Sequence, residues 1–330
     1  MRMTAFPAAH VFAIAAIAAG AMTVGPAAAQ EVTLRAVSAF QEGTAFSRNF
    51  ERFVERVNAE GAGQIRINYI GGTRAMPPFE VGNAVRSGVV NMANVTGAFY
   101  TNLMPEADGF KLATRPMSEQ RRNGAWEFVN GLHNQRLNAW YLARQFQNVP
   151  FHFYFRARPQ NVERLDFTGL KIRVTPVYRA LVEALGGTAM QTAPGEVFTA
   201  MERGVVDGYG WPVLGVFDLG WEQVTRFRLD PGFYNVDVNV LVNLESWRRL
   251  SDRQRQILET AALWLEGLDA ENVAIIEAER QRQGQANIQA IALPEADARR
   301  FLERANEVAW QSVIRQSPET GARLRQLIAN

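Results

Sequence analysis

The chain has 330 residues, with 35 basic and 33 acidic side chains, a formal net charge of +2 and no cysteine. This near balance of charge gives no reason to expect nucleic acid as a partner, and the scattered arginines form no polybasic patch. The missing cysteines exclude disulfides and thiol chemistry. A chain of this size forms one large or two medium domains and folds without covalent cross-links.

Residues 1–29 have the three parts of a secretory signal. A basic start at Arg2 is followed by an apolar, alanine-rich run from Val11 to Val24 and by small residues up to Ala29. A membrane anchor is the alternative, but this run is shorter than the roughly 20 residues that span a bilayer. We therefore expect cleavage after Ala29 and a mature protein that is free in the periplasm.

The chain then alternates between strand and helix patterns. Strands are predicted at 32–38, 65–70 and 89–95, with helices at 44–61 and 79–85 between them. Such alternation is typical of a mainly parallel sheet covered by helices on both faces. Side chains that follow the first and third strands are expected to face a ligand cleft. These candidates are Phe40, Gln41, Asn94, Thr96 and Tyr100.

A predicted helix at 118–136 leads to strand patterns at 139–146 and 150–156, which are expected to cross between two lobes. In the second strand apolar rings alternate with polar side chains, which places the polar groups on one face. Phe153 is a candidate for a cavity wall, and His152 for a hydrogen bond to a ligand oxygen. For both residues the alternative is a structural role in the core.

The stretch from Leu165 to Pro212 repeats the β-α-β-α-β order. In its run GLKIRV the apolar residues alternate with Lys171 and Arg173, which predicts a strand with both cations on one face. Arg173 ends that strand, and its planar guanidinium matches a carboxylate in two parallel hydrogen bonds. We hypothesise that Arg173 anchors a ligand carboxylate. The alternative is an ion pair with Glu163 or Asp166.

The same stretch ends in the turn DGYGWP, after predicted helices at 177–185 and from Pro194 onward. Tyr209 and Trp211 lie there between glycines and a proline, where backbone and rings approach a ligand closely. These rings are therefore candidates for a cavity wall, with core packing as the alternative.

The rest of the chain is predicted to return to the first lobe. A strand pattern at 233–242 is followed by a helix pattern at 251–282, and about 30 helical residues extend about 45 Å, enough to contact both lobes. A short strand at 288–293 precedes the last helices. The expected lobe boundaries are 30–150 with 238–276 for lobe I, and 151–237 with 277–330 for lobe II.

The runs GLKIRV, PVY and GEVFTAMERGVVDG resemble the solute-binding subunit of tripartite ATP-independent periplasmic (TRAP) transporters, a DctP-like family that includes dicarboxylate and sialic acid receptors. The resemblance covers residues 31–285 in the order of elements. It implies an α/β, two-lobed periplasmic binding protein fold of class II type, with hinge strands and a long helix spanning both lobes. It also implies that Arg173 pairs with a ligand carboxylate and that the receptor delivers its ligand to membrane subunits.

The sequence departs from parts of this family. Some members have a substrate-binding asparagine at the position of Trp211, and the tryptophan here is similar to that of the 2-oxo-acid receptors. Those receptors have an acidic residue before the tryptophan that helps to hold a cation, and this chain has Gly210 in its place. The sialic acid branch has a second arginine about twenty residues before the one that corresponds to Arg173. Counting back by that distance in this chain leads to His152 and Phe153, which are not arginines. Arg156 and Arg158 are the candidates for a second carboxylate, with a solvated strand end as the alternative.

We therefore expect a monomeric receptor for a small organic acid, without cofactor, metal or nucleic acid. A 2-hydroxy, 2-oxo or aromatic monocarboxylate is the expected ligand, and a C4-dicarboxylate is the alternative. The sequence has no G-x-S-x-G, H-E-x-x-H or phosphate-binding glycine loop. An enzyme that uses carboxylates alone is the alternative from another functional class.

Overall fold

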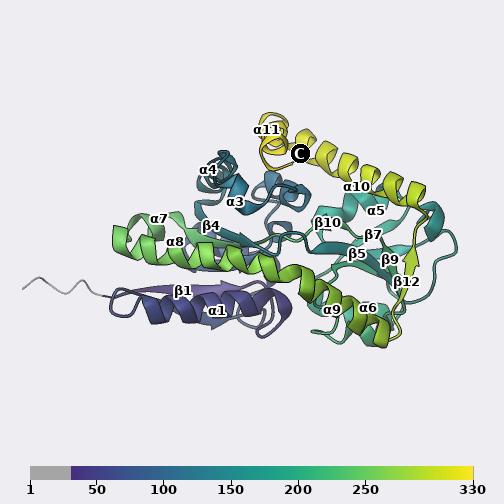
Figure 1. The fold of residues 1–330 in the computed structure, drawn as a ribbon, viewed down its shortest axis with the longest axis horizontal. Helices are drawn as coiled ribbons and strands as arrows, with labels where there is room; N and C mark the ends of the chain where they lie inside the picture. The colour runs from purple at the N-terminus through teal and green to yellow at the C-terminus, as the bar shows by residue number, and fades with distance from the viewer. Residues whose placement is uncertain (1–30, 330) are drawn as a thin grey trace, which may run out of the picture. The chain divides into compact units, whose positions relative to one another are not determined.

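The computed structural model describes residues 31–329, so the signal segment expected at 1–29 lies outside the described residues. Two β-sheets with helices packed on them form two lobes in this part of the chain (Figure 1). Within residues 31–329, no helix combines the length and the apolar character that a membrane crossing requires.

Lobe I is built on a five-stranded sheet with the order β2-β1-β3-β11-β4. Its strands are β1 (Val32–Ser38), β2 (Ile65–Gly71), β3 (Met92–Val95), β4 (Ala139–Gln145) and β11 (Val238–Asn243). Strand β1 pairs in parallel with β2 and β3, as the alternating pattern predicts, whereas β11 runs antiparallel to β3 and β4. Its helices are α1 (Ala45–Glu60), α2 (Val81–Ser87), α3 (Met117–Gln120), α4 (Ala125–Leu137), α7 (Leu244–Arg248) and α8 (Asp252–Gly267).

Lobe II is built on a seven-stranded sheet with the order β12-β9-β5-β8-β6-β7, and β10 pairs with β5. Its strands are β5 (Pro150–Phe155), β6 (Lys171–Val174), β7 (Thr188–Gln191), β8 (Gly208–Pro212), β9 (Phe227–Asp230), β10 (Phe233–Asn235) and β12 (Gln289–Ala292). Strand β6 is parallel to β7 and β8, whereas β5 is antiparallel to β8. Its helices are α5 (Arg179–Ala184), α6 (Val197–Glu202), α9 (Asn272–Gln285) and α10 (Glu295–Gln316), followed by the C-terminal α11 (Pro318–Ile328).

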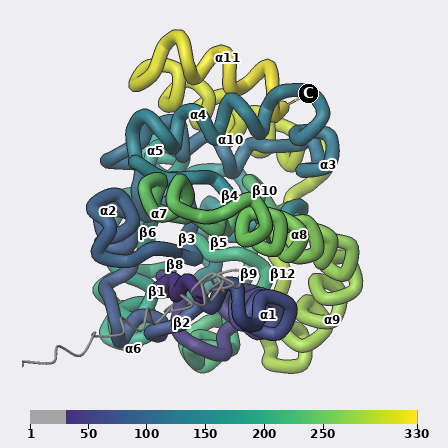
Figure 2. Tube along the Cα trace, turned by 90° about the vertical axis from the view of Figure 1, so that its left-hand side faces the viewer, coloured from purple at the N-terminus to yellow at the C-terminus, as the bar shows by residue number. Residues whose placement is uncertain are grey.

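Short 3-10 helices connect many of these elements. They span Pro78–Glu80, Gly97–Phe99, Pro105–Leu112, Val162–Arg164, Pro176–Tyr178, Pro194–Glu196, Trp221–Val224 and Leu268–Glu271. One apolar core lies between α1, α8 and the lobe I sheet, and a larger one continues from the other face of that sheet into lobe II. Helix α1 packs beside α8 (Figure 2).

The chain passes between the lobes in loops, where long crossing strands were expected. Strand β4 belongs to the first sheet and β5 to the second, so the first crossing lies at 146–149. Phe146 and Asn148 have φ of 68° and 61° there, a left-handed conformation that ends a strand. The strand predicted at 233–242 is divided into β10 and β11, because the chain changes sheets at Asp237.

The long helix predicted at 251–282 consists of α8 and α9, joined by the 3-10 helix Leu268–Glu271 (Figure 1). Helix α8 packs on β4 of lobe I, and Gln283 of α9 donates a 2.7 Å hydrogen bond to the Val213 carbonyl of lobe II. At the junction, the Asp269 carboxylate accepts the N–H groups of Phe146 and Gln147 at 2.7 and 3.1 Å. The helix thus contacts both lobes and holds the first crossing loop.

The C-terminal helices also connect the two lobes. Helix α10 packs on α5 of lobe II, and α11 packs on α4 of lobe I. Only Ser317 separates these two helices. The Ile328 carbonyl accepts the backbone N–H of Arg115 at 3.1 Å, which fixes the end of α11 to lobe I.

Candidate functional site

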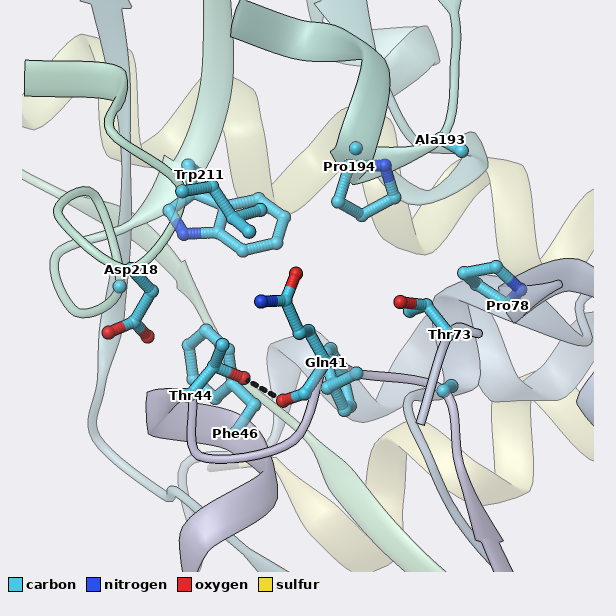
Figure 3. A pocket seen from close by; sticks show the side chains of 14 residues that line it. Gln41, Thr44, Phe46, Thr73, Pro78, Ala193, Pro194, Trp211 and Asp218 are labelled. Carbon is cyan, nitrogen blue, oxygen red and sulfur yellow. Dashed lines mark hydrogen bonds between the residues drawn. The ribbon is translucent and has the colours of Figure 1, made fainter. Parts of the chain in front are cut away.

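A cavity of about 180 Å³ lies between the two lobes. Lobe I contributes the loop after β1, with Phe40, Gln41 and Thr44, and the nearby Thr73. Figure 3 shows the Gln41 amide and the Thr73 hydroxyl directed into the space below the Trp211 indole. The remaining lining residues are Ala39, Phe46, Pro78, Ala193, Pro194, Gly195, Gly215, Asp218 and Leu219.

A second, smaller cavity of about 30 Å³ lies next to the first, on the side of Thr96 and Thr175. It shares Phe40, Phe46 and Trp211 with the first cavity and extends toward Thr175 and Tyr178. Trp211 is therefore a wall of both spaces. The Phe46 and Trp211 rings meet edge to face across the lobes, with centroids 5.9 Å apart.

Arg173 lies behind the Tyr178 and Trp211 walls of these cavities. Its Nη2 and Nε donate to the Thr192 carbonyl at 2.7 and 3.1 Å, and its Nη1 donates to the Tyr178 hydroxyl at 3.1 Å. The centre of the guanidinium is 5.8 Å from the centroid of the Trp211 ring. Tyr178 is fixed in turn by a 2.6 Å hydrogen bond to the Gly210 carbonyl. The guanidinium is thus held in one orientation.

The burial of Arg173 argues against the alternative of a surface ion pair. The alternation in β6 predicted that Lys171 and Arg173 share one face, and on that face Arg173 has 0 % of its surface exposed whereas Lys171 is exposed. Burial lowers the pKa of the Arg173 guanidinium, against the opposing effect of the Tyr178 hydroxyl.

No carboxylate of residues 31–329 lies within ion-pair distance of the Arg173 guanidinium, and Glu196 acts on its charge only from a longer range. Of the two acids that the alternative interpretation required, Glu163 pairs with Arg158 at the surface and Asp166 accepts the Thr168 N–H at 2.9 Å. A buried cation without a counter-ion is costly, and neutral hydrogen-bond acceptors offset only part of that cost. The position of Arg173 therefore favours an external anion.

Three further polar atoms beside the cavities lack a hydrogen-bond partner within the described part of the chain. They are Oγ1 of Thr175, Oγ1 of Thr192 and Nε1 of Trp211, all buried. Thr175 and Thr192 directly follow β6 and β7, and Trp211 lies near the end of β8. In α/β sheets ligands bind outside the carboxyl ends of the strands. These atoms converge on such an edge and offer hydrogen bonds to a polar ligand.

Tyr209 and Phe153, which the sequence suggested as cavity walls, belong to the core instead. The Tyr209 hydroxyl lies 2.8 Å from Oγ1 of Thr225, and the ring stacks on Tyr154. Phe153 stacks on Phe233 at 4.5 Å. Neither lines either cavity. Tyr209 precedes Trp211 by two residues, which places it about 7 Å further from the strand end.

The polar candidates on β5 also lie away from the cavities. Nδ1 of His152 is 2.9 Å from both the Leu229 carbonyl and the Asp230 carboxylate, a buried structural arrangement. Arg156 and Arg158 are exposed. Because β5 is antiparallel to β8, its carboxyl end lies at the sheet edge opposite to the end of β8 that carries Trp211. Arg156 and Arg158 therefore lie away from both cavities, and a second carboxylate site at these arginines stays a prediction.

The lobe I candidates divide in the same way. Phe40 and Gln41 line the main cavity, and Thr96 lines the smaller one. Asn94 is buried and donates to the Phe46 carbonyl at 2.8 Å, and the Tyr100 hydroxyl is 3.1 Å from Nε2 of His133. Asn94 and Tyr100 therefore stabilise lobe I and line neither cavity.

Sequence reasoning missed several lining residues. Thr175 directly follows β6, and the run Ala193–Gly195 comes just after β7. Applying the strand-end rule to every predicted strand would have found these residues. Thr73 follows the end of β2 by two residues, so the same rule would have found it, whereas Asp218 lies in a loop away from any strand end and no sequence signal marks it.

Asp218 is the one charged residue in the described lining of the main cavity, which contains no Lys, Arg or His. Among the cations close to this lining are Arg173, which lies behind Trp211, and Arg48, whose Nη2 is 3.5 Å from Oδ1 of Asp218. Residues 31–329 contain no group of three or more His, Asp or Glu side chains placed to hold a metal ion.

The chain matches the family model of DctP, described as bacterial extracellular solute-binding protein, family 7, over residues 37–316. It is 23% identical over 315 residues to a solute-binding protein of Roseobacter denitrificans, covering 92% of this chain and 93% of that protein. It is 25% identical over 224 residues to the monocarboxylate 2-oxoacid-binding periplasmic protein of a Nostoc species, covering 64% of this chain and 60% of that relative.

Solved structures share the fold. The DctP7 extracytoplasmic solute receptor of Bordetella pertussis, which binds pyroglutamic acid, superposes with a TM-score of 0.78 at 16% identity and covers 90% of this chain and 99% of its own. A TRAP periplasmic solute-binding protein from Desulfovibrio salexigens with bound orotic acid gives a TM-score of 0.79 at 16% identity, covering 90% of this chain and 97% of its own. The two-lobed α/β fold predicted from the sequence is confirmed.

Proposed function

The chain belongs to family 7 of the bacterial extracellular solute-binding proteins, and from this premise we propose that it is the periplasmic receptor of a TRAP transporter for a small monocarboxylate. The resemblance to the TRAP solute-binding family seen in the sequence is confirmed by this match. Members of the family are solute-binding receptors. The proposed role is to capture the acid between the lobes and to deliver it to the membrane subunits.

The observation that carries the acid proposal is the buried Arg173 without a counter-ion. Its guanidinium is fixed by Thr192 and Tyr178 and lies directly behind the cavity wall formed by Trp211. A ligand carboxylate that enters between Tyr178 and Trp211 would supply the missing negative charge. The partnerless hydroxyl groups of Thr175 and Thr192 support the same location for a polar ligand group.

The lining of the main cavity supports one carboxylate rather than two. Away from Arg173, its polar side chains include the neutral Gln41 and Thr73 and the acidic Asp218. A second carboxylate would meet no cation in that lining and would be repelled by Asp218, which already contacts Arg48. The aromatic and aliphatic remainder of the lining suits an apolar or ring-shaped body, which fits a 2-hydroxy, 2-oxo or aromatic acid.

The comparisons are consistent with this class without naming the acid. One relative is described as binding monocarboxylate 2-oxoacids, and structural neighbours were solved with pyroglutamic or orotic acid. Another neighbour, from Rhodoferax ferrireducens, holds malonate, a dicarboxylate. We favour the monocarboxylate because Arg156 and Arg158, the candidates that the sequence offered for a second anchor, lie at the sheet edge opposite to Trp211.

A thermal-shift screen of the purified mature chain tests the proposal. The panel contains pyroglutamate, orotate, lactate, 2-oxo acids of increasing size, malonate, succinate, neutral sugars and amines. A ligand at 100 times its dissociation constant adds about 2.7 kcal/mol of stability. We expect monocarboxylates to give the largest shifts and to be recovered chemically unchanged. Stabilisation only by dicarboxylates would refute the single-anchor geometry, and stabilisation only by sugars or amines would refute the acid class.

A further inference from the structure

A hydrogen bond joins the two lobes at the rim of the main cavity. Asp218, in the lobe II loop after β8, accepts the backbone N–H of Ala45 through Oδ2 at 2.6 Å. Ala45 is the first residue of α1 in lobe I. The other oxygen, Oδ1, lies 3.5 Å from Nη2 of Arg48 on the same helix. Figure 3 shows Asp218 beside Thr44, at the edge of the cavity.

Helix α1 lacks a cap from its own lobe. Its N-cap residue, Thr44, makes no side-chain cap hydrogen bond, because the hydroxyl donates to the Gln41 carbonyl at 2.6 Å. The first turn also contains no acidic residue. The N–H groups at the start of a helix need acceptors and favour negative charge. Asp218 supplies both from the opposite lobe.

The same loop is coupled to the cavity wall. Gly215 has φ of +89°, and a Cβ there would lie 3.2 Å from Nε1 of Trp211. That Cβ would also lie 3.4 Å from Phe46 of α1 and from Oδ2 of Asp218. The absence of a side chain at Gly215 therefore allows the first turn of α1, the indole wall and the Asp218 carboxylate to meet.

We propose that Asp218 is an inter-lobe latch that stabilises the closed arrangement of the lobes before any ligand binds. Both partners of the latch belong to the chain, so the contact forms without a ligand and does not depend on which acid the receptor takes. The cap and the charge interaction of Asp218 together change the ratio of closed to open molecules by a factor of about five to thirty. Ligand affinity scales with the closed fraction, so losing the latch weakens binding by up to the same factor.

The test measures lobe separation directly. The sequence has no cysteine, so Asn68→Cys in β2 and Glu202→Cys in α6, both exposed, accept one spin label each. Double electron-electron resonance on the ligand-free mature chain then gives the populations of short and long distances. These are compared among the labelled parent, Asp218→Ala, Asp218→Asn and Ser251→Ala.

Ser251 is the matched control, because its hydroxyl caps α8 within lobe I by accepting the Gln254 N–H. We expect Asp218→Ala to lower the closed-to-open ratio at least fivefold. Asp218→Asn, which keeps an oxygen acceptor, should retain part of that ratio, and Ser251→Ala should leave it unchanged. A parent chain without a closed population, or a parent-like ratio in Asp218→Ala, would overturn the proposal. An equal loss in Ser251→Ala would overturn it as well, since the effect would then not be specific to the latch.

Discussion

Replacing Arg173 separates ligand binding from folding, because its buried charge has no carboxylate of residues 31–329 within ion-pair distance. In Arg173→Ala a bound carboxylate would lie away from water without a cation. Leaving a buried charge unpaired costs about 3–5 kcal/mol, which is two to four decades in affinity. Arg173→Lys keeps the charge but loses the two-donor fork, so we expect an intermediate affinity.

Arg173→Met gives the sharper test. Removing a buried charge also removes its desolvation cost, which offsets the loss of its hydrogen bonds to the Thr192 carbonyl and the Tyr178 hydroxyl. The three hydrogen bonds of Arg173 go to neutral oxygens, and Tyr178 keeps its bond to the Gly210 carbonyl. We therefore expect Arg173→Met to keep the melting temperature of the ligand-free wild type while binding is lost.

The assay is isothermal titration with the acid that gives the largest thermal shift, with circular dichroism to verify folding. Arg179→Ala is the control, because Arg179 is a partly exposed arginine in the same segment, paired with Glu183. Its affinity should stay within about twofold of the wild type. Wild-type affinity in Arg173→Ala would refute the anchor. Unfolding of both Arg173→Ala and Arg173→Met would show that the arginine is structural.

Three further predictions follow from the cavity and the crossing loops. Trp211→Ala should weaken ligand binding at least about thirtyfold. Tyr209→Phe should cost about 1 kcal/mol of stability and leave the affinity measured by titration unchanged. Equal losses of affinity in the two variants would contradict the core position of Tyr209. Gln41→Arg adds a cation to the cavity, so malonate should bind at least tenfold more tightly than to the wild type, and unchanged malonate affinity would argue against the single-anchor geometry. Burial raises the pKa of Asp237 from 3.8 to about 6, against hydrogen bonds such as that from the Gly97 N–H. The native state thus holds this proton more tightly than the unfolded chain, and wild-type stability falls as pH rises through this window, by about 3 kcal/mol. Urea unfolding from pH 4 to 7 should show Asp237→Asn gaining that amount relative to the wild type, and a constant difference would contradict it.

The alternation of side chains predicted the strands well but not their surroundings. The pattern GLKIRV gave β6 and located Arg173 at its carboxyl end, close to the cavity. It left open whether that face is exposed, because alternation reports which residues share a face and not what covers that face. Only the tertiary arrangement of β7, β8 and their helices shows that Arg173 is buried.

Strand direction was the second limit of the sequence. The pattern at β5 is the same whichever way the strand runs, and Arg156 became a candidate because it lies close to the position of the second arginine in the sialic acid branch. Pairing of Phe151 with Pro212 and of Phe155 with Gly208 shows the antiparallel direction, which moves Arg156 to the far edge. Asp218 illustrates a third limit, because its partner is a backbone N–H in the other lobe and leaves no trace in composition or spacing.

Helices α10 and α11, which meet at Ser317, form a further connection between the lobes. Loop 146–149, the turn at Asp237 and the 3-10 helix Leu268–Glu271 already connect them, and α11 attaches the end of the chain to lobe I. Each connection restricts the translation and the twisting of one lobe relative to the other. The motion that remains is mainly a hinge rotation that opens and closes the cavity. A ligand that fixes such a restricted pair of bodies loses less rigid-body entropy than one that joins freely moving bodies. More of its contact energy then appears as affinity, even for a molecule small enough to fill a cavity of about 180 Å³.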